Sequence, residues 1–295
     1  MTAELTSAAE RPTRVFLANV GVNSSHRLRS PVFGDGSFEF IPIPEERALN
    51  GPPPLPTYGD LRCYNTNEPL LRFVGPHLMK AYERRVVHYD PNLKNPNDGA
   101  ISAWTYGDIP FASGRAASLR HARPGDWLLF LASLVPYRNG SYCSARGSLY
   151  LIGYLNIERV LIHDVENGML RDIVTGAACP LEQCRFNVHV LRSLYLPDIY
   201  RSERFMVFNG NALSRRFTRA VPLERDLCDA CLRGAGGYPF DYKRYRSLNA
   251  CLGVYTRSVR CWFDLGRADD QERFRTLLAT VRKWNTDLPV DCARD

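Results

Sequence analysis

Runs of apolar residues and stretches of alternating apolar and polar residues divide the chain into predicted elements. Val15–Val20 is short and mostly apolar, which predicts a first buried strand after a loose tail over 1–14. Phe38–Pro44 alternates, but its two prolines confine it to an edge strand or an extended segment. Asp126–Leu134 and Ser148–Ile162 are rich in β-forming residues and are separated by turn residues, which predicts two neighbouring antiparallel strands.

Helical patterns are fewer. Pro76–Arg85 is expected to form a short helix, because proline suits the first helical position and apolar residues follow at helical spacing. Another helix opens at Asp269, with Glu272 three residues later. Its apolar face is formed by Phe274, Leu277, Leu278, Val281 and Trp284. Three shorter strands are predicted at Val86–Tyr89, Arg204–Phe208 and Arg219–Leu223.

These elements predict an α+β fold, in which a curved mixed or antiparallel β-sheet or barrel carries flanking helices and long loops. The order of Gly125 and Asp126 before one strand, with Gly153 near the middle of the next, is similar to the core of small β-barrels of the PUA, ASCH and EVE kind. We expect one main domain over 15–225. A C-terminal extension over 226–295 is expected to end in a helix packed on that domain.

Composition is that of a folded protein, with 45% hydrophobic and 23% charged residues among 295. The formal net charge of +7, supplied mostly by arginine, favours a nucleotide or DNA as the partner, although an inert basic surface explains the same charge. No apolar run approaches the ~20 residues of a membrane-spanning helix and no secretory h-region is present, so we expect a cytoplasmic protein without membrane contact. Nine scattered cysteines favour reduced thiols.

The densest polar region is 19–45, directly after the first predicted strand. Binding sites are commonly built from loops at strand ends, although ordinary turn chemistry accounts for the same residue types. The candidates that we select there are Asn19, Asn23, His26, Ser30, Asp35 and Glu39.

A second candidate site is the pair His88 and Asp90. Residues two apart on a strand share one face, so the pair can act as a general base with its orienting partner or can hold a metal. No third ligand is spaced to specify a metal, and a structural histidine is the alternative. Aromatic residues that can stack on a base are Trp104, Tyr106 and Trp127.

Arginines gather around 209–211, and such a cluster either contacts phosphates or forms a solvated face. Its members are Arg201, Arg204, Arg215, Arg216, Arg219 and Arg225, of which Arg215 and Arg216 are the selected nucleotide-binding candidates. Cys228 and Cys231 form a C-x-x-C pair, with Cys179 and Cys184 upstream, but their spacing matches a zinc site only loosely. We therefore expect buried thiols, no metal and no cofactor.

Several motifs occur in order over 15–223: NVGVN, DGSFEFIPIPE, HYDPN, WTYGD, PGDWLLFLASL, YLIGY, NVHVLR and FMVFNGNALSRRFTRAVPL. Together they resemble the third family of nucleotide-modification-associated domains. That group is associated by genomic context with systems that modify DNA bases, which implies a role near modified nucleotides and other proteins of such systems as partners. The resemblance points to His26, Ser30, Asp35, Glu39, Glu45, His88, Asp90, Asp126, His189 and Arg215.

The expected function is recognition or processing of a modified nucleotide or base in a DNA-modification or defence system. No P-loop, dinucleotide fingerprint, H-E-x-x-H motif or nucleophile elbow is present, so whether the protein is an enzyme stays open. A non-catalytic reader of modified bases and a structural or regulatory partner are the alternatives. For the site itself, we expect five side chains around one concavity: His26, Asp35, Glu39, His88 and Asp90.

Overall fold

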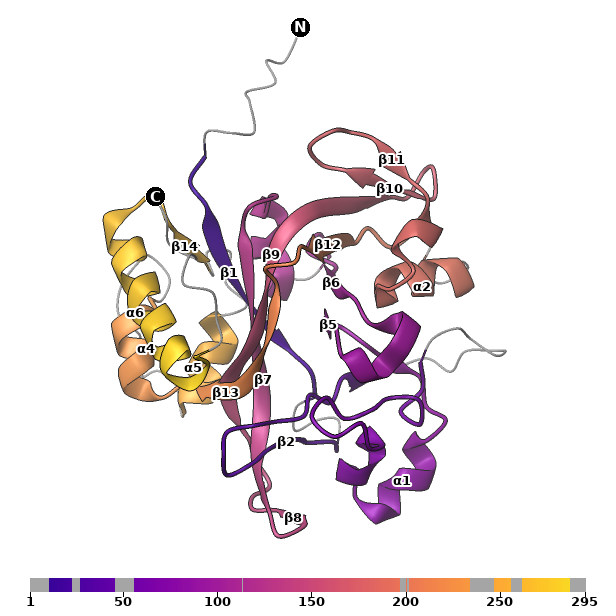
Figure 1. Ribbon diagram of the computed structural model, residues 1–295. Helices are drawn as coiled ribbons and strands as arrows, with labels where there is room; N and C mark the ends of the chain where they lie inside the picture. The colour runs from indigo at the N-terminus through magenta and orange to yellow at the C-terminus, as the bar shows by residue number, and fades with distance from the viewer. Residues whose placement is uncertain are drawn as a thin grey trace, which may run out of the picture.

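A large twisted mixed sheet runs through the computed structural model (Figure 1). The structure describes residues 11–22, 27–45, 56–112, 114–196, 200, 202–233, 247–255 and 262–286. The main path of the sheet is β14 (Trp262–Asp264), β1 (Arg14–Val20), β7 (Trp127–Arg138), β9 (Ser148–Asp164), β12 (Met206–Gly210), β6 (Trp104–Asp108) and β5 (Asn92–Leu93). Branching from it are β2 (Ser30–Val32), β8 (Ser141–Tyr142), β10 (Met169–Asp172), β11 (Ala178–Cys179) and β13 (Arg215–Pro222). A separate small pair joins β3 (Ile43–Pro44) to β4 (Val87–His88).

The long strands β7 and β9 form the centre of the sheet, and they pair antiparallel from Trp127 opposite Asn156 to Leu134 opposite Ser148. This confirms the strand pair predicted from the β-forming runs. β1 confirms the first predicted strand and lies parallel to β7. The α+β class with a large mixed sheet is therefore confirmed. The PUA-like barrel is not, since the strands of the described residues form an open path that ends at β14 and β5 and does not close.

Helical segments lie around the sheet and are mostly short. They are η2 (Leu70–Phe73), α1 (Pro76–Tyr82), η3 (Pro96–Ile101), η4 (Gly114–His121), η5 (Leu181–Cys184), α2 (Val188–Tyr195), α4 (Arg225–Cys231), α5 (Leu248–Tyr255) and α6 (Ala268–Trp284). α1 and α6 are the two helices predicted from sequence. No helix in the described part of the chain has the length and apolar character needed to cross a membrane.

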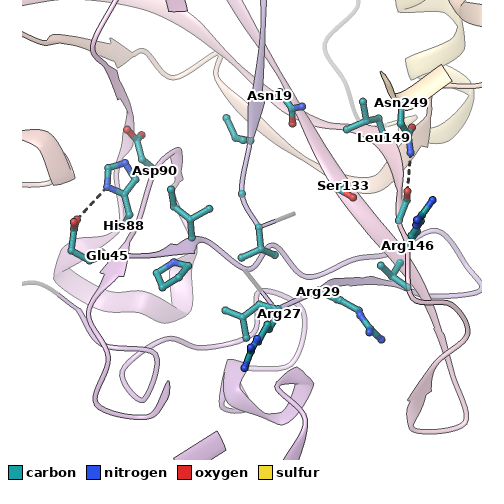
Figure 2. A pocket seen from close by; sticks show the side chains of 18 of the residues that line it. Asn19, Arg27, Arg29, Glu45, His88, Asp90, Ser133, Arg146, Leu149 and Asn249 are labelled. Atoms are coloured by element: carbon teal, nitrogen blue, oxygen red, sulfur yellow. Dashed lines mark hydrogen bonds and ion pairs between the residues drawn. The ribbon is translucent and has the colours of Figure 1, made fainter. Parts of the chain in front are cut away.

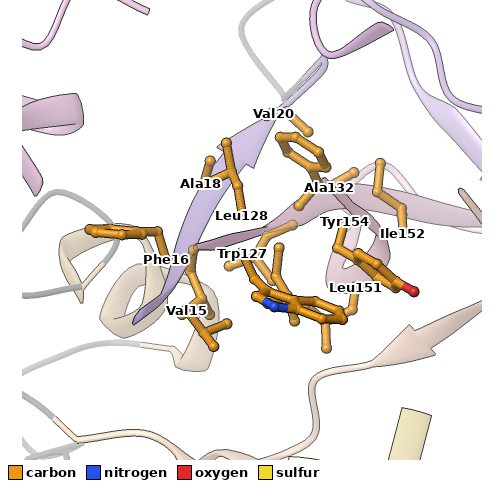
Figure 3. Packing of buried hydrophobic residues seen from close by; sticks show 14 of the residues in the cluster. Val15, Phe16, Ala18, Val20, Trp127, Leu128, Ala132, Leu151, Ile152 and Tyr154 are labelled. Atoms are coloured by element: carbon orange, nitrogen blue, oxygen red, sulfur yellow. The ribbon is translucent and has the colours of Figure 1, made fainter. Parts of the chain in front are cut away.

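The main hydrophobic core lies between the sheet and the C-terminal helices. Figure 3 shows part of it, where side chains of β1, β7 and β9 such as Phe16, Trp127 and Tyr154 pack together. Central strands covered on both faces read as continuous apolar runs, and Trp127 to Leu131 is such a run. In the same cluster are Phe274 and Leu277 of α6, so the C-terminal segment contributes to the main core.

The weaker strand predictions need adjustment at their ends. Phe38–Pro44 is mainly extended chain, with a single bridge at Phe38 and the short strand β3, because its prolines cannot donate ladder hydrogen bonds. The strand expected at Arg219–Leu223 begins earlier, at Arg215, and pairs with β9. Gly153 of β9 permits this pairing, since a Cβ there would lie 2.6 Å from the Arg215 carbonyl oxygen.

Candidate functional site

A cavity of about 1070 Å³ opens where β1, β6, β7 and α2 meet (Figure 2). It arises from an interruption in the strand beside β7. β1 pairs with β7 as far as Ala132, and β2 resumes the pairing at Leu134. Between them the chain leaves the sheet next to Ser133, and residues of this excursion line the cavity together with Asn19 of β1.

One side of the pocket carries a buried carboxylate–imidazole pair. Pairing of β3 with β4 sets Ile43 opposite His88, which brings the following Glu45 to the His88 ring. The Glu45 carboxylate lies 3.4 Å from Nδ1 of His88 and 3.1 Å from the guanidinium of Arg192 on α2. Burial lowers the pKa of His88 to about 4, despite the opposing effect of Glu45, so the imidazole is neutral near pH 7.

Asp90 and His189 complete this side. The backbone N–H of Gly107 donates to Oδ2 of Asp90 at 2.8 Å, and Nε2 of His189 lies 3.7 Å from the same oxygen. Burial raises the pKa of Asp90 well above its usual range. His189 lies in the first turn of α2, and Asn187, directly before the helix, caps it by accepting the His189 N–H with its side chain.

The second nitrogen of His189 faces another acid. Its Nδ1 lies 3.7 Å from the carboxylate of Glu203. Burial opposes ionisation of Glu203, but the contact with His189 and the positive charge of Arg192 outweigh it, so its pKa is lowered. Both imidazoles therefore have a glutamate beside Nδ1, and the two rings meet edge to face with centroids 5.1 Å apart.

Three arginines line the pocket away from this acidic cluster, as Figure 2 shows for Arg27, Arg29 and Arg146. All three are exposed, and the Arg29 guanidinium lies over the Tyr142 ring at 5.6 Å. The pocket is thus polarised, with carboxylates, imidazoles and the ion-paired Arg192 on one side and the three exposed guanidinium groups on the other. Such guanidinium groups can bind a phosphate or carboxylate.

The structure brings together only some of the predicted site residues. Among those selected from sequence, the pocket is lined by Asn19, His88, Asp90 and Tyr106. Two residues that the family resemblance implied, Glu45 and His189, also line it. Asn23 and His26 lie outside the described residues.

Asp35 and Glu39 do not line this pocket, which corrects the expected common concavity. Asp35 lies in an exposed turn and accepts from the Ser37 backbone and hydroxyl, which lowers its pKa. Glu39 is buried 3.6 Å from Arg216 and accepts the N–H of Tyr64. Glu39 and Arg216 thus satisfy each other's charges away from the main pocket.

The remaining candidates have structural contacts of their own. The Ser30 hydroxyl accepts the Ile41 N–H, and Trp127 packs against Tyr154 in the core with ring centroids 4.8 Å apart. Trp104 packs against the same core, and Arg215 donates to the carbonyls of Ala212 and Ser214. Asp126, another residue implied by the resemblance, accepts the backbone N–H groups of Arg14 and Arg123.

Sequence reasoning missed Arg192, Glu203 and the arginines that line the pocket. Arg192 follows His189 by three residues, and this helical spacing places both on one face. That spacing was the available signal. Glu203 offered none, because it contacts His189 from a position just before β12 that belongs to no helix or strand.

A metal was not expected because no third ligand was spaced beside His88 and Asp90, and the structure places His189 next to both. A donor atom from each of the three lies within 4.8 Å of the other two, and no other such group occurs among the described residues. The cysteines of the considered zinc site are all buried, but Cys228 and Cys231 lie in the main core whereas Cys179 and Cys184 lie in another cluster. Burial raises the pKa of Cys228 to about 12 and that of Cys231 to about 11, so these thiols stay protonated.

The fold and site define an α+β domain with a polarised pocket at an interruption of its central sheet. The model of one family, described as nucleotide modification associated domain 3, matches residues 14–219. The chain therefore belongs to the nucleotide modification associated domain 3 family, as its motifs predicted. Comparison with curated proteins and with solved structures found no match.

Proposed function

We propose that the polarised pocket binds a nucleotide and processes it, or a modified base within it, in a DNA-modification or defence system. The observation that carries this proposal is the separation of charge across one cavity. Arg27, Arg29 and Arg146 lie on one side, and the half-buried His88 and the buried Asp90 lie on the other. A nucleotide has the same polarity, with an anionic phosphate at one end and a neutral hydrogen-bonding base at the other.

The size and lining of the pocket support this assignment. Ligand pockets commonly enclose ~300–1,000 Å³, and the volume of about 1070 Å³ suits a mononucleotide with room for solvent. A guanidinium group can donate two parallel hydrogen bonds to the oxygens of one phosphate. Asn19 and Ser133, which lie between the two charged sides in Figure 2, supply an amide and a hydroxyl for the edge of a base.

Processing is favoured over passive reading of a base. A reader needs an aromatic-lined cleft, but Trp104 and Trp127 pack into the core and only Tyr106 among the selected aromatics lines this pocket. By contrast, two histidines and three carboxylates converge at its buried side. Burying several titratable groups together costs free energy, and such clusters are typical of active sites.

Calorimetric titration with deoxynucleoside monophosphates and with the matching nucleosides tests the proposal. We expect the monophosphate to bind more tightly, and Arg29→Ala with Arg146→Ala to remove at least about tenfold of that affinity, since a charge-assisted contact contributes ~1.5–3 kcal/mol. Arg138→Ala is the matched control, because Arg138 is exposed on β7 and does not line the pocket. Equal affinities for nucleotide and nucleoside, unchanged in the double variant, would remove the phosphate assignment.

Catalysis is tested separately by nucleoside mass spectrometry of DNA and nucleotide pools from cells with and without the protein. We expect a modified nucleoside to change in abundance with the wild-type protein and not with the Asp90→Asn variant. Tight nucleotide binding without such a change would favour the reader alternative.

A further inference from the structure

His88, Asp90 and His189 place two imidazoles and one carboxylate around a single point at the buried side of the pocket. One donor atom of each lies within 4.8 Å of the other two. We propose that these three residues bind one divalent transition-metal ion of the Zn²⁺ or Fe²⁺ kind. This donor set is the one that proteins use for catalytic Zn²⁺ and for non-haem Fe²⁺.

An unsatisfied polar atom at this point is the first support. Oδ1 of Asp90 is buried and has no hydrogen-bond partner in the structure, whereas the buried Nδ1 of His189 lies on the side of Glu203. The 3.7 Å separation of Asp90 and His189 is too long for a hydrogen bond between them. Buried polar atoms normally have a hydrogen-bond partner, so an unpaired one indicates a position where a water or an ion can bind. An ion between the side chains would bind the carboxylate that the protein leaves partly unpaired.

The surroundings of the two histidines are the second support. Nδ1 of His88 lies 3.4 Å from Glu45, and Nδ1 of His189 lies 3.7 Å from Glu203. Metal-binding imidazoles commonly direct one ring nitrogen to a carboxylate, which fixes the ring and makes the other nitrogen a better ligand. Nδ1 of His88 is within hydrogen-bond distance of its glutamate, and Nδ1 of His189 faces its glutamate from slightly farther, so Nε2 of each ring is the nitrogen left for the ion. The Gly107 N–H fixes Asp90 in the same way at 2.8 Å.

Charge balance is the third support. The cluster contains the carboxylates of Asp90, Glu45 and Glu203, whereas Arg192 is the one guanidinium that contacts it among the described residues. Buried charges are normally paired or coordinate a metal, so a group of carboxylates at this point favours a cation beside them.

Three protein ligands leave further coordination positions on the ion. These positions face the pocket, because His88, Asp90 and His189 all line it. An ion with open positions can take water or an oxygen of a bound molecule, which distinguishes a catalytic site from a structural one. The proposal stands on the ligand geometry and goes beyond the nucleotide assignment, so either can hold without the other.

Metal binding is tested on the full chain after removal of metal with a chelator. Co²⁺ is the spectroscopic probe, and Zn²⁺ is titrated by calorimetry. We expect one equivalent of each, with visible Co²⁺ absorption from nitrogen and oxygen ligands and without a sulfur charge-transfer band. Anaerobic competition between Fe²⁺ and Zn²⁺ then shows which ion the site prefers.

Variants locate the site. Asp90→Asn keeps the size of the side chain and its acceptor for the Gly107 N–H, and His189→Gln keeps a polar group; both are expected to lose stoichiometric binding. Glu203→Gln is expected to weaken binding about 10- to 100-fold, as for other residues that orient a ligand. His121→Ala is the control, since His121 is exposed and lies outside the pocket, and its metal affinity should equal that of the wild type.

Absence of stoichiometric binding by the wild type, full binding in both ligand variants, or a sulfur charge-transfer band would each overturn the proposal. If a variant fails to fold, as judged by circular dichroism, X-ray absorption of the wild-type Co²⁺ form decides in its place: imidazole and oxygen scattering supports the site, and sulfur scattering refutes it. Titration of the metal-depleted chain with a mononucleotide shows independently whether the nucleotide assignment stands.

Discussion

At Gly107, strand β6 passes so close to helix α2 that there is no room for a side chain. A Cβ at this position would lie 2.5 Å from Cδ2 of His189 and 2.8 Å from the side chain of Asn187, which caps α2. Only glycine therefore lets β6 approach α2 closely enough for its N–H to bind Asp90. The WTYGD motif thus includes a residue whose lack of a side chain shapes the pocket.

We predict that Gly107→Ala lowers the free energy of unfolding by about 1–3 kcal/mol, the usual cost of inserting a methyl group into a packed region. It should also weaken binding in the pocket, because His189 must move. Chemical denaturation and ligand titration measure the two effects. Gly34→Ala is the control, since no atom lies within 4 Å of its added Cβ, and it should change stability by less than about 0.5 kcal/mol. Unchanged stability and binding in Gly107→Ala would show that α2 can move away from the added methyl group without cost, which would refute the prediction.

At the level of elements, β13 is joined to the N-terminal segment by a buried ion pair. Arg216 of β13 lies 3.6 Å from Glu39, and it also donates to the Phe38 carbonyl at 2.7 Å. Its guanidinium lies over the rings of Phe38 and Tyr64 at 4.1 and 3.9 Å. Residues far apart in the chain are thereby fixed beside the core.

Replacing Arg216 by methionine should destabilise the protein by about 3–5 kcal/mol, because Glu39 would be left as an uncompensated buried charge. Arg215→Met is the matched control one residue away, where the side chain is partly exposed and donates only to nearby carbonyls; its expected effect is within about 0.5 kcal/mol. Adding Glu39→Gln to Arg216→Met should restore part of the loss. Equal melting temperatures for the two arginine variants would refute the buried pair.

The hairpin of β9 and β10 carries an exposed pair whose stabilising effect depends on pH. The Arg171 guanidinium and the Asn167 amide donate to Asp164, and they lower the pKa of Asp164 to about 2. Because the pKa of Asp164 is lower in the folded state than its unfolded value of ~3.9, ionisation of Asp164 favours the folded protein. This stabilisation is complete above the unfolded pKa and is lost as the pH falls toward 2. Asp164→Asn should therefore lower the melting temperature slightly at pH 7 and have no effect near pH 2.

Carboxyl NMR titration measures this pKa directly. In the Arg171→Met variant we expect the pKa of Asp164 to rise toward its ordinary value, because its first hydrogen-bond donor is removed. A wild-type pKa near ~4 would show that the pair does not persist in solution.

Over the whole molecule, local patterns predicted the strands and helices better than the site. The pair β7 and β9 and the helix α6 follow from β-forming runs and helical spacing within one segment. The open sheet did not follow, because which strands become edges is decided by distant pairings such as β14 with β1. The site depends on long-range contacts too, since His189 meets His88 only through the packing of α2.

Several arginines that add to the net charge are held in structural contacts. Arg216 and Arg192 are consumed by buried carboxylates, and Arg204 lies over the Phe111 ring at 4.2 Å. Of the arginine cluster predicted around 209–211, Arg204, Arg215 and Arg216 thus make structural contacts, and Arg201 lies outside the described residues. The arginines available to a ligand instead come from the loops beside the cavity, at Arg29 and Arg146.

The family match ends at residue 219, but the main hydrophobic core also includes residues after this position. β14 pairs with β1, and α6 packs against β13, β14 and α4. The Asn285 side chain, which follows α6, both accepts the Arg219 N–H and donates to the Arg219 carbonyl. The C-terminal segment thus covers one edge of the sheet and one side of the core.

We therefore predict that the family-matching region does not fold without this segment. A chain that stops after Leu223 should show no cooperative thermal unfolding, because it exposes the main core. In the full chain, Leu277→Ala should cost about 2–5 kcal/mol, since Leu277 is completely buried, whereas Thr276→Ala on the exposed side of α6 should cost less than about 0.5 kcal/mol. Cooperative melting of the shortened chain at the wild-type temperature would instead make residues 14–219 an independent folding unit.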